Sequence, residues 1–220
     1  VEAEHISTSI RATTVRIPPQ AEITRNITLR APDVGDEAAV HFSVAARGRA
    51  LEQTVSIRVV APPTGLPPGE WGVYTIWEAE DLSHSNGSAV DDPAAYNEQA
   101  WGAFEEADKG EGVDTATVWG PYEQLTPGTY AVAFRLRNAS QHEGILAKID
   151  CFDFYAMKAG GNSYLAQQDV YGSDLPSDNS YADVWLDFEI AEPRKCEYRV
   201  WWQDKGSVVV DRVVILKQLG

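Results

Sequence analysis

The stretch GTYAVAFRLR, residues 128–137, places a large apolar side chain at every second position, namely Tyr130, Val132, Phe134 and Leu136. The same alternation returns in residues 184–190 and 198–202, and no stretch repeats with the 3.6-residue period of a helix. Period two is typical of strands with one buried face. Eight strands are predicted in this part of the chain: 73–80, 114–119, 128–137, 145–157, 163–170, 181–190, 196–203 and 207–216. The expected fold is all-β, a jelly-roll-like β-sandwich.

The first 62 residues show the same alternation on a smaller scale. Apolar side chains alternate in residues 23–29, 40–44 and 55–59, and Gly, Pro and Asp residues separate these runs. This pattern predicts a small antiparallel β-sandwich, immunoglobulin-like in kind. A complete sandwich of that type takes about 100 residues, so we expect this domain to be truncated upstream or to pack against the neighbouring domain.

A proline-rich segment separates the two parts. Residues 61–70 hold four of the 12 prolines of the chain. Proline fixes φ and removes a backbone donor, which keeps a segment extended. The predicted organisation is a small domain over residues 1–62, a linker over 63–71 and the larger β-sandwich over 72–220.

Charge is divided unevenly along the chain. The net charge is −15, and residues 63–220 hold 26 acidic against 11 basic side chains. An acidic domain repels nucleic acid and anionic membranes, which are bound through clustered Lys and Arg. The charge balance favours cations and neutral ligands, and the chain holds no apolar run of about 18 residues to span a bilayer.

Two further features concern cellular context. The chain starts at Val1 with no Met and no apolar leader, so we expect a processed or excised part of a longer protein. Cys151 and Cys196 have no metal-ligand spacing. One disulfide between neighbouring strands and two buried thiols both remain open.

Three acidic residues lie on predicted strands, at positions where a carboxylate requires a binding partner. Glu78 and Glu80 lie two positions apart on a predicted strand, so they share a face about 7 Å apart. Asp211 interrupts the apolar run of residues 208–215, where a buried carboxylate is costly unless it is paired or coordinated. Calcium is the hard cation that such oxygen clusters hold. A carboxylate cluster paired with Arg or backbone groups is the alternative.

These residues carry a resemblance to a known family. The E-x-E of Glu78 and Glu80, the Gly128-Thr129-Tyr130 element and the Val210-Asp211-Arg212-Val213 strand resemble the calcium-containing β-sandwich carbohydrate-binding modules of families 6, 35 and 36, which are galactose-binding-like in fold. The resemblance spans about residues 73–217. It implies a structural calcium held by Glu78, Glu80 and Asp211. Those modules often carry an Asn just before the last-strand Asp to bind sugar hydroxyls, whereas this chain has Val209 and Val210.

Sugar rings stack on exposed aromatic side chains while polar groups bind their hydroxyls. Two segments combine these features, the loop of residues 91–101 and the hairpin of residues 201–206. Adjacent Trp201 and Trp202 must point to opposite faces, one into the core and one outward. Trp77 and Trp119 are expected in the core. The sugar-binding candidates are Tyr96, Asn97, Trp101, Trp201, Trp202 and Asp204.

No catalytic residues are predicted. The four histidines are scattered singly, and nucleophile-elbow, P-loop and dinucleotide-binding motifs are absent from the sequence. Three close carboxylates hold a metal more naturally than they divide the acid and base roles of a glycosidase. The leading hypothesis is a non-catalytic, calcium-stabilised module that binds a glycan. It would belong to a larger secreted or cell-surface protein with a neighbouring catalytic domain, such as a glycoside hydrolase or lyase. The alternative is a structural module that packs between domains and binds no sugar.

Overall fold

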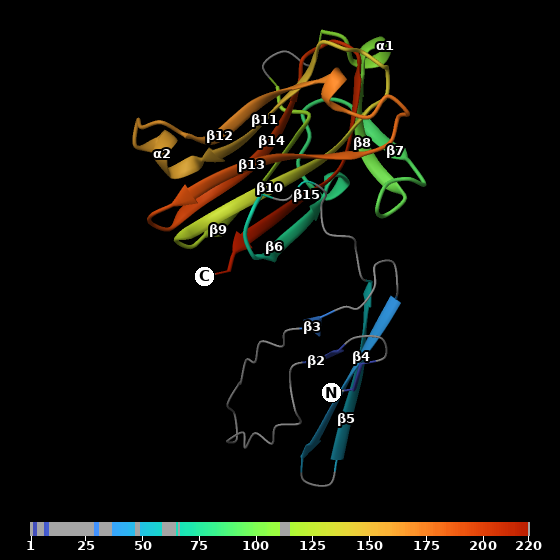
Figure 1. Cartoon of the computed structure of the whole chain (residues 1–220), viewed down its shortest axis with the longest axis vertical. Helices are drawn as coiled ribbons and strands as arrows, with labels where there is room; N and C mark the ends of the chain where they lie inside the picture. The colour runs from blue at the N-terminus through green and yellow to red at the C-terminus, as the bar shows by residue number, and fades with distance from the viewer. Residues whose placement is uncertain are drawn as a thin grey trace. The chain divides into compact units, whose positions relative to one another are not determined.

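The computed structural model describes residues 65, 67–110 and 115–219 in full and, nearer the N-terminus, the backbone of five strands (Figure 1). The chain divides into two compact units, Val1–Pro62 and Pro63–Gly220. No helix in the described part of the chain is long and apolar enough to cross a membrane.

The first unit is built from antiparallel strands. One sheet has the order β1 (Glu2–Ala3), β4 (Glu37–Ala46) and β5 (Arg49–Arg58), while β2 (Ser7–Thr8) pairs with β3 (Leu29–Arg30). Strands β4 and β5 form a hairpin in which Ala46 pairs with Arg49. The alternating runs predicted at 40–44 and 55–57 lie in this hairpin. The run predicted from residue 23 to residue 28 and Val59 lie outside the described residues, and the immunoglobulin-like assignment stays a prediction.

The second unit is a sandwich of two antiparallel sheets. The six-stranded sheet has the order β13 (Ala182–Ile190), β10 (Gly128–Asn138), β15 (Ser207–Gln218), β8 (Gln99–Phe104) and β7 (Ser88–Asp91), and β6 (Trp71–Glu78) also pairs with β15. The four-stranded sheet has the order β12 (Tyr164–Tyr171), β11 (Ile145–Asp153), β14 (Arg194–Trp202) and β9 (Val118–Leu125). The prediction of an all-β sandwich is confirmed.

The core lies between the two sheets. Period two sends Tyr130 and Phe134 of β10 inward, where they meet Tyr198 and Trp202 of β14, and all four side chains are fully buried. Cys151 and Cys196 lie in the same core as free thiols on the neighbouring strands β11 and β14. Burial and the contact with Cys196 raise the pKa of the Cys151 thiol well above its ordinary value.

Several element boundaries differ from those predicted. The strand predicted over 145–157 ends at Asp153, because the Asp153 carboxylate accepts hydrogen bonds from the amides of Tyr155 (2.9 Å) and Ala156 (3.1 Å) and so starts helix α2 (Phe154–Lys158). The segment expected as a loop contains the start of β8, and β7 was not predicted. Three further single turns are helical: η1 (Ala79–Asp81), α1 (Glu105–Asp108) and η2 (Gly172–Asp174).

The end of the predicted linker is attached to the second unit. The Trp71 indole donates to the carbonyl of Pro67 (2.8 Å), and the amide of Leu219 donates to the carbonyl of Glu70 (2.8 Å). Trp71 and Trp185 pack on the outer face of the six-stranded sheet, over a small apolar cluster made by Ala131, Ala133, Val214 and Leu216. Residues 67–70 are therefore held against this sheet by hydrogen bonds and packing.

Candidate functional site

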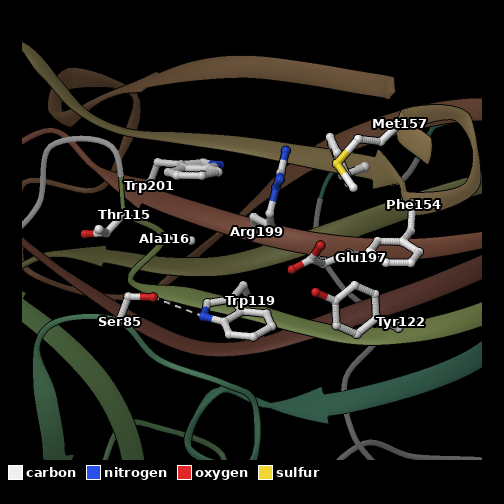
Figure 2. Close-up of a pocket in the computed structure, with 11 residues that line it drawn as sticks. Ser85, Thr115, Ala116, Trp119, Tyr122, Phe154, Met157, Glu197, Arg199 and Trp201 are labelled. Carbon is white, nitrogen blue, oxygen red and sulfur yellow. Dashed lines mark hydrogen bonds between the residues drawn. The ribbon is translucent and has the colours of Figure 1, made fainter. Parts of the chain in front are cut away.

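An aromatic groove lies on the outer face of the four-stranded sheet. It has a volume of about 350 Å³ and opens to solvent (Figure 2). Its walls come from β9, β11, β14 and α2 and from residues 85 and 115–116. The lining residues with rings or charges are Trp119, Tyr122, Phe152, Phe154, Glu197, Arg199 and Trp201.

The alternation of β14 explains the floor of the groove. Cys196, Tyr198, Val200 and Trp202 point into the core, so the intervening residues point outward. The three outward residues are Glu197, Arg199 and Trp201. The same strand thus supplies core packing on one face and a charged, aromatic surface on the other.

Asp150 of β11 fixes two of these floor residues. Its carboxylate accepts a hydrogen bond from Arg199 Nε (2.7 Å) and another from Trp201 Nε1 (2.7 Å). Asp150 is only 1% exposed, and this burial raises the pKa of its carboxyl although the Arg199 guanidinium acts in the opposite direction. The guanidinium also lies 3.9 Å from the centroid of the Phe152 ring, a cation–π contact. Arg199 and Trp201 are therefore held in place before any ligand arrives.

Two polar groups remain available in the groove. Glu197 is 6% exposed, and burial raises the pKa of its carboxyl. Figure 2 shows this carboxylate between Arg199 and Tyr122. Arg199 Nη2 is buried and has no hydrogen-bond partner among the described residues. The groove thus offers one acceptor and one donor close together, beside the rings of Trp119, Tyr122 and Trp201.

The structure separates the two tryptophans predicted as alternatives. Trp201 faces outward and lines the groove, whereas Trp202 is fully buried and donates its indole N–H to the carbonyl of Lys205 (3.2 Å). The candidacy of Trp202 as a sugar-binding residue is therefore corrected, because no ligand reaches its ring. Trp119 was expected in the core, and this is wrong. Since Val118 points inward, the alternation turns Trp119 into the groove, and this signal was present in the sequence.

The other sugar-binding candidates lie away from the groove. Trp101 of β8 packs against the core, stacks on the His84 ring with centroids 3.5 Å apart, and donates to the carbonyl of Asn86 (2.8 Å). Asp204 accepts a hydrogen bond from the amide of Gly110 (2.7 Å). These contacts clamp loops, so the structure gives Trp101 and Asp204 a structural explanation.

Tyr96 and Asn97 lie near the predicted metal-binding acids instead. The Arg212 guanidinium lies 4.7 Å from the Tyr96 ring centroid, and the Asn97 side chain makes a hydrogen bond to Glu80. The structure therefore does not bring the six candidates into one site.

The predicted metal ligands are only partly brought together. Asp211 is fully buried, and its carboxylate accepts hydrogen bonds from Arg135 Nε (2.8 Å) and from the amide of Tyr96 (2.9 Å). This is the Arg- and backbone-paired arrangement that the sequence left open. No three His, Cys, Asp or Glu side chains among the residues described are arranged to hold a metal.

Glu78 and Glu80 nevertheless carry unsatisfied oxygens. Each has one buried carboxylate oxygen without a hydrogen-bond partner in the described part of the chain. Burial, followed by the charge of Asp211, raises the pKa of Glu78 from 4.5 to about 7. Buried, unpartnered oxygens beside a third carboxylate fit a hard cation. Asp211 would have to share its carboxylate between that cation and Arg135, and calcium stays a prediction.

Comparison with known proteins finds similarity in structure alone. No protein-family model and no curated protein matches the chain. The C-terminal family 6 carbohydrate-binding module of LamC, a laminarinase from Zobellia galactanivorans, is 14% identical, with a TM-score of 0.43 over 65% of this chain and 98% of that one. The module CBM6cm-2 of Cellvibrio mixtus lichenase 5A, solved with cellotriose, is 13% identical, with a TM-score of 0.41 over 67% and 100%.

A third similar structure is an adhesin domain. The K1 cleaved adhesin domain of Lys-gingipain from Porphyromonas gingivalis is 13% identical, with a TM-score of 0.40 over 70% of this chain and 94% of that one.

Proposed function

We propose that this chain is a non-catalytic carbohydrate-binding module whose ligand lies in the aromatic groove. The observation that carries the proposal is a set of partly exposed rings around one buried acceptor and one buried donor. Sugar rings stack their C–H faces on such aromatic surfaces, while a few placed polar groups select hydroxyl positions. Trp119, Tyr122 and Trp201 are the stacking residues, and Glu197 and Arg199 bind the hydroxyls.

The state of the carboxylates supports binding without hydrolysis. A glycosidase uses two carboxyl groups on either side of the scissile bond. Among the described residues that line the groove, Glu197 is the only acid. Asp150 lies beside it but is committed to Arg199 and Trp201. An acid that is bound on both oxygens serves as an anchor for the floor.

The setting of the module is part of the proposal. An open, shallow groove gives micromolar to millimolar dissociation constants, and attachment to a neighbouring domain turns such weak binding into local concentration on a polymer. We therefore place the chain in a larger secreted or cell-surface carbohydrate-active protein, with a glycoside hydrolase or lyase as the neighbouring domain.

Substitution of Trp119 tests the site. Trp119→Ala is expected to weaken polysaccharide binding about tenfold or more, because truncation of a central aromatic anchor costs about 2 kcal/mol. Its ring makes one side-chain hydrogen bond, to Ser85 Oγ (3.2 Å), so the fold should be retained. The measurement is affinity electrophoresis and calorimetry against a panel of soluble polysaccharides.

The matched control is Tyr74→Ala. Tyr74 is 38% exposed and lies on β6, in the other sheet, so its loss should leave binding unchanged. If no polysaccharide is retained by the folded protein, the structural, domain-packing module becomes the better account. If binding survives Trp119→Ala, the ligand lies elsewhere on the unit.

Calcium is the second element of the proposal, with Glu78, Glu80 and Asp211 as its protein ligands. Saturating calcium is expected to raise the free energy of unfolding by about 2–3 kcal/mol, because ion binding to the folded state adds RT ln(1 + [L]/Kd). Urea unfolding in calcium and in chelator measures the difference. The paired substitution Glu78→Gln/Glu80→Gln should remove the response to calcium. The same urea midpoint of unfolding in calcium and after exhaustive chelation would contradict a stabilising calcium site.

A further inference from the structure

The floor of the groove holds a cation with an unused donor. Arg199 is 9% exposed, and its Nε is bound to Asp150, but its Nη2 is buried without a partner in the described part of the chain. Leaving such a donor unpaired costs free energy that an incoming acceptor recovers. Charged acceptors make the strongest hydrogen bonds to guanidinium groups. A negative group that approaches Nη2 from the groove would supply the partner that this buried donor lacks.

Three lysines lie over aromatic rings in or beside the groove. Each amino group lies over an aromatic ring that lines the groove or adjoins its lining: Lys195 over Tyr122 (5.8 Å), Lys158 over Phe154 (4.5 Å) and Lys148 over Tyr164 (5.6 Å). Tyr164 packs edge-on against Phe152 of the groove. None of the three lysines forms an ion pair with a described carboxylate. We call these residues the lysine collar.

The charges in and beside the groove show a small positive excess, in contrast to the negative charge of the whole chain. The collar and Arg199 supply four positive charges. Asp150 offsets Arg199, Glu197 lies in the groove, and Asp169 pairs in register with Lys148 across β11 and β12. The net charge of −15 acts over longer distances, and salt screens it beyond about 8–10 Å. A ligand in the groove experiences mainly the collar and the floor.

We propose that the groove binds an anionic polysaccharide, one whose pyranose rings carry carboxylate or sulfate groups. The inference rests on the proposed function and narrows its ligand class from the neutral glycans that composition favours. The anionic group accepts from Arg199 Nη2, the rings of Trp119 and Trp201 stack on the sugar, and the lysine collar attracts neighbouring charges of the polymer. Glu197 opposes the anion and accepts a hydroxyl of the same sugar.

The direct test compares polymers that differ only in charge. Polygalacturonate and its fully methyl-esterified, neutral form share one backbone, and dextran sulfate and dextran form the corresponding sulfate pair. The protein is expected to bind at least one charged member about tenfold more tightly than its neutral partner, and to lose this preference as salt is raised. Calorimetry and affinity electrophoresis at low and high salt measure the ratio, and the two pairs distinguish carboxylate from sulfate.

Variants of the collar provide the second measurement. The triple substitution Lys148→Gln/Lys158→Gln/Lys195→Gln should weaken binding of the charged polymer about tenfold, reduce its salt dependence and leave thermal unfolding unchanged. Lys205→Gln, an exposed lysine of the β14–β15 hairpin, is the matched control. Glu197→Gln should strengthen binding of the charged polymer, because it removes the opposing charge at constant shape.

The outcomes separate the two proposals. Equal binding of the charged and neutral partners, lost in Trp119→Ala and unaffected by the triple substitution, would overturn the anionic ligand and leave the carbohydrate-binding function standing. Absence of binding to any polysaccharide would remove both.

Discussion

Trp202→Ala is expected to lower the free energy of unfolding by about 3–5 kcal/mol, the range for removing a fully buried aromatic side chain. Trp202 is among the largest fully buried side chains of the sandwich, and its indole N–H also holds the hairpin through the carbonyl of Lys205. The change leaves a large cavity between the sheets and an unpaired carbonyl. Urea unfolding, followed by far-ultraviolet circular dichroism, measures the loss.

The neighbouring tryptophan is the matched control. Trp201→Ala removes an outward ring and one hydrogen bond to Asp150, so we expect about 1 kcal/mol of destabilisation together with loss of polysaccharide binding. The two adjacent substitutions should therefore act on different properties, stability for Trp202 and binding for Trp201. Equal stability losses at the two positions would contradict the assignment of their faces.

Asp150→Ala is expected to lower the free energy of unfolding by about 3–5 kcal/mol, because it leaves the Arg199 guanidinium buried without its counter-charge. Asp150 is 1% exposed and bonds both Arg199 and Trp201, so its removal frees two floor residues at once. Binding should be lost even at temperatures where the variant is folded. Denaturant unfolding and calorimetry on the same preparation measure both effects.

Two controls belong to this prediction. Asp150→Asn keeps an acceptor for Trp201 and loses the charge, so its stability should lie between those of the wild type and Asp150→Ala. Asp169→Ala removes an exposed acid from the adjacent strand β12, and should change the free energy of unfolding by less than about 0.5 kcal/mol. A loss below about 1 kcal/mol for Asp150→Ala would show that Arg199 finds another partner, with Glu197 the nearest choice.

The fold was accessible from sequence because its strongest signals are local. Residues 128–137 alternate without interruption, and the strand β10 formed by Gly128–Asn138 matches the prediction closely. Strand β8 was missed because Gly102 and Ala103 supply little apolar contrast, and because Pro93 and consecutive acids just before it indicate a loop. A short strand between two others is stabilised by pairing with them. The alternation pattern of its own residues contains no information about that pairing.

The candidate site was less accessible, for two physical reasons. The groove combines residues from β9, β11, β14 and α2, and the sequence gives their faces without saying which strands are neighbours. Only Trp201 of the groove was selected, since it sits beside a turn. Asp150 was not singled out from the sequence, because its pairing with Arg199 depends on the register of β11 against β14.

The surroundings of Asp211 show where the two-residue alternation of strand side chains fails as a predictor. Arg135 pairs in register with Arg212 and Leu136 with Val210, so Asp211 is the extra residue of a bulge. At a bulge the inward–outward alternation of side chains shifts by one residue. The neighbouring residues of the same strand then no longer indicate which side chain Asp211 contacts. The cation that meets Asp211 comes from the neighbouring strand, as Arg135.

The pairing of β6 with β15 has a consequence for evolution and engineering. Trp71 is opposite Gln218, and the amide of Leu219 donates to the carbonyl of Glu70, so the first and last strands of the described unit have their outer ends one strand spacing apart, about 5 Å. The groove lies on the opposite sheet, away from this double junction. A host protein can accept the unit by opening a single surface loop, with no rearrangement of its own framework. Such geometry suits transplantation between unrelated scaffolds, with the groove on the sheet opposite the two chain ends.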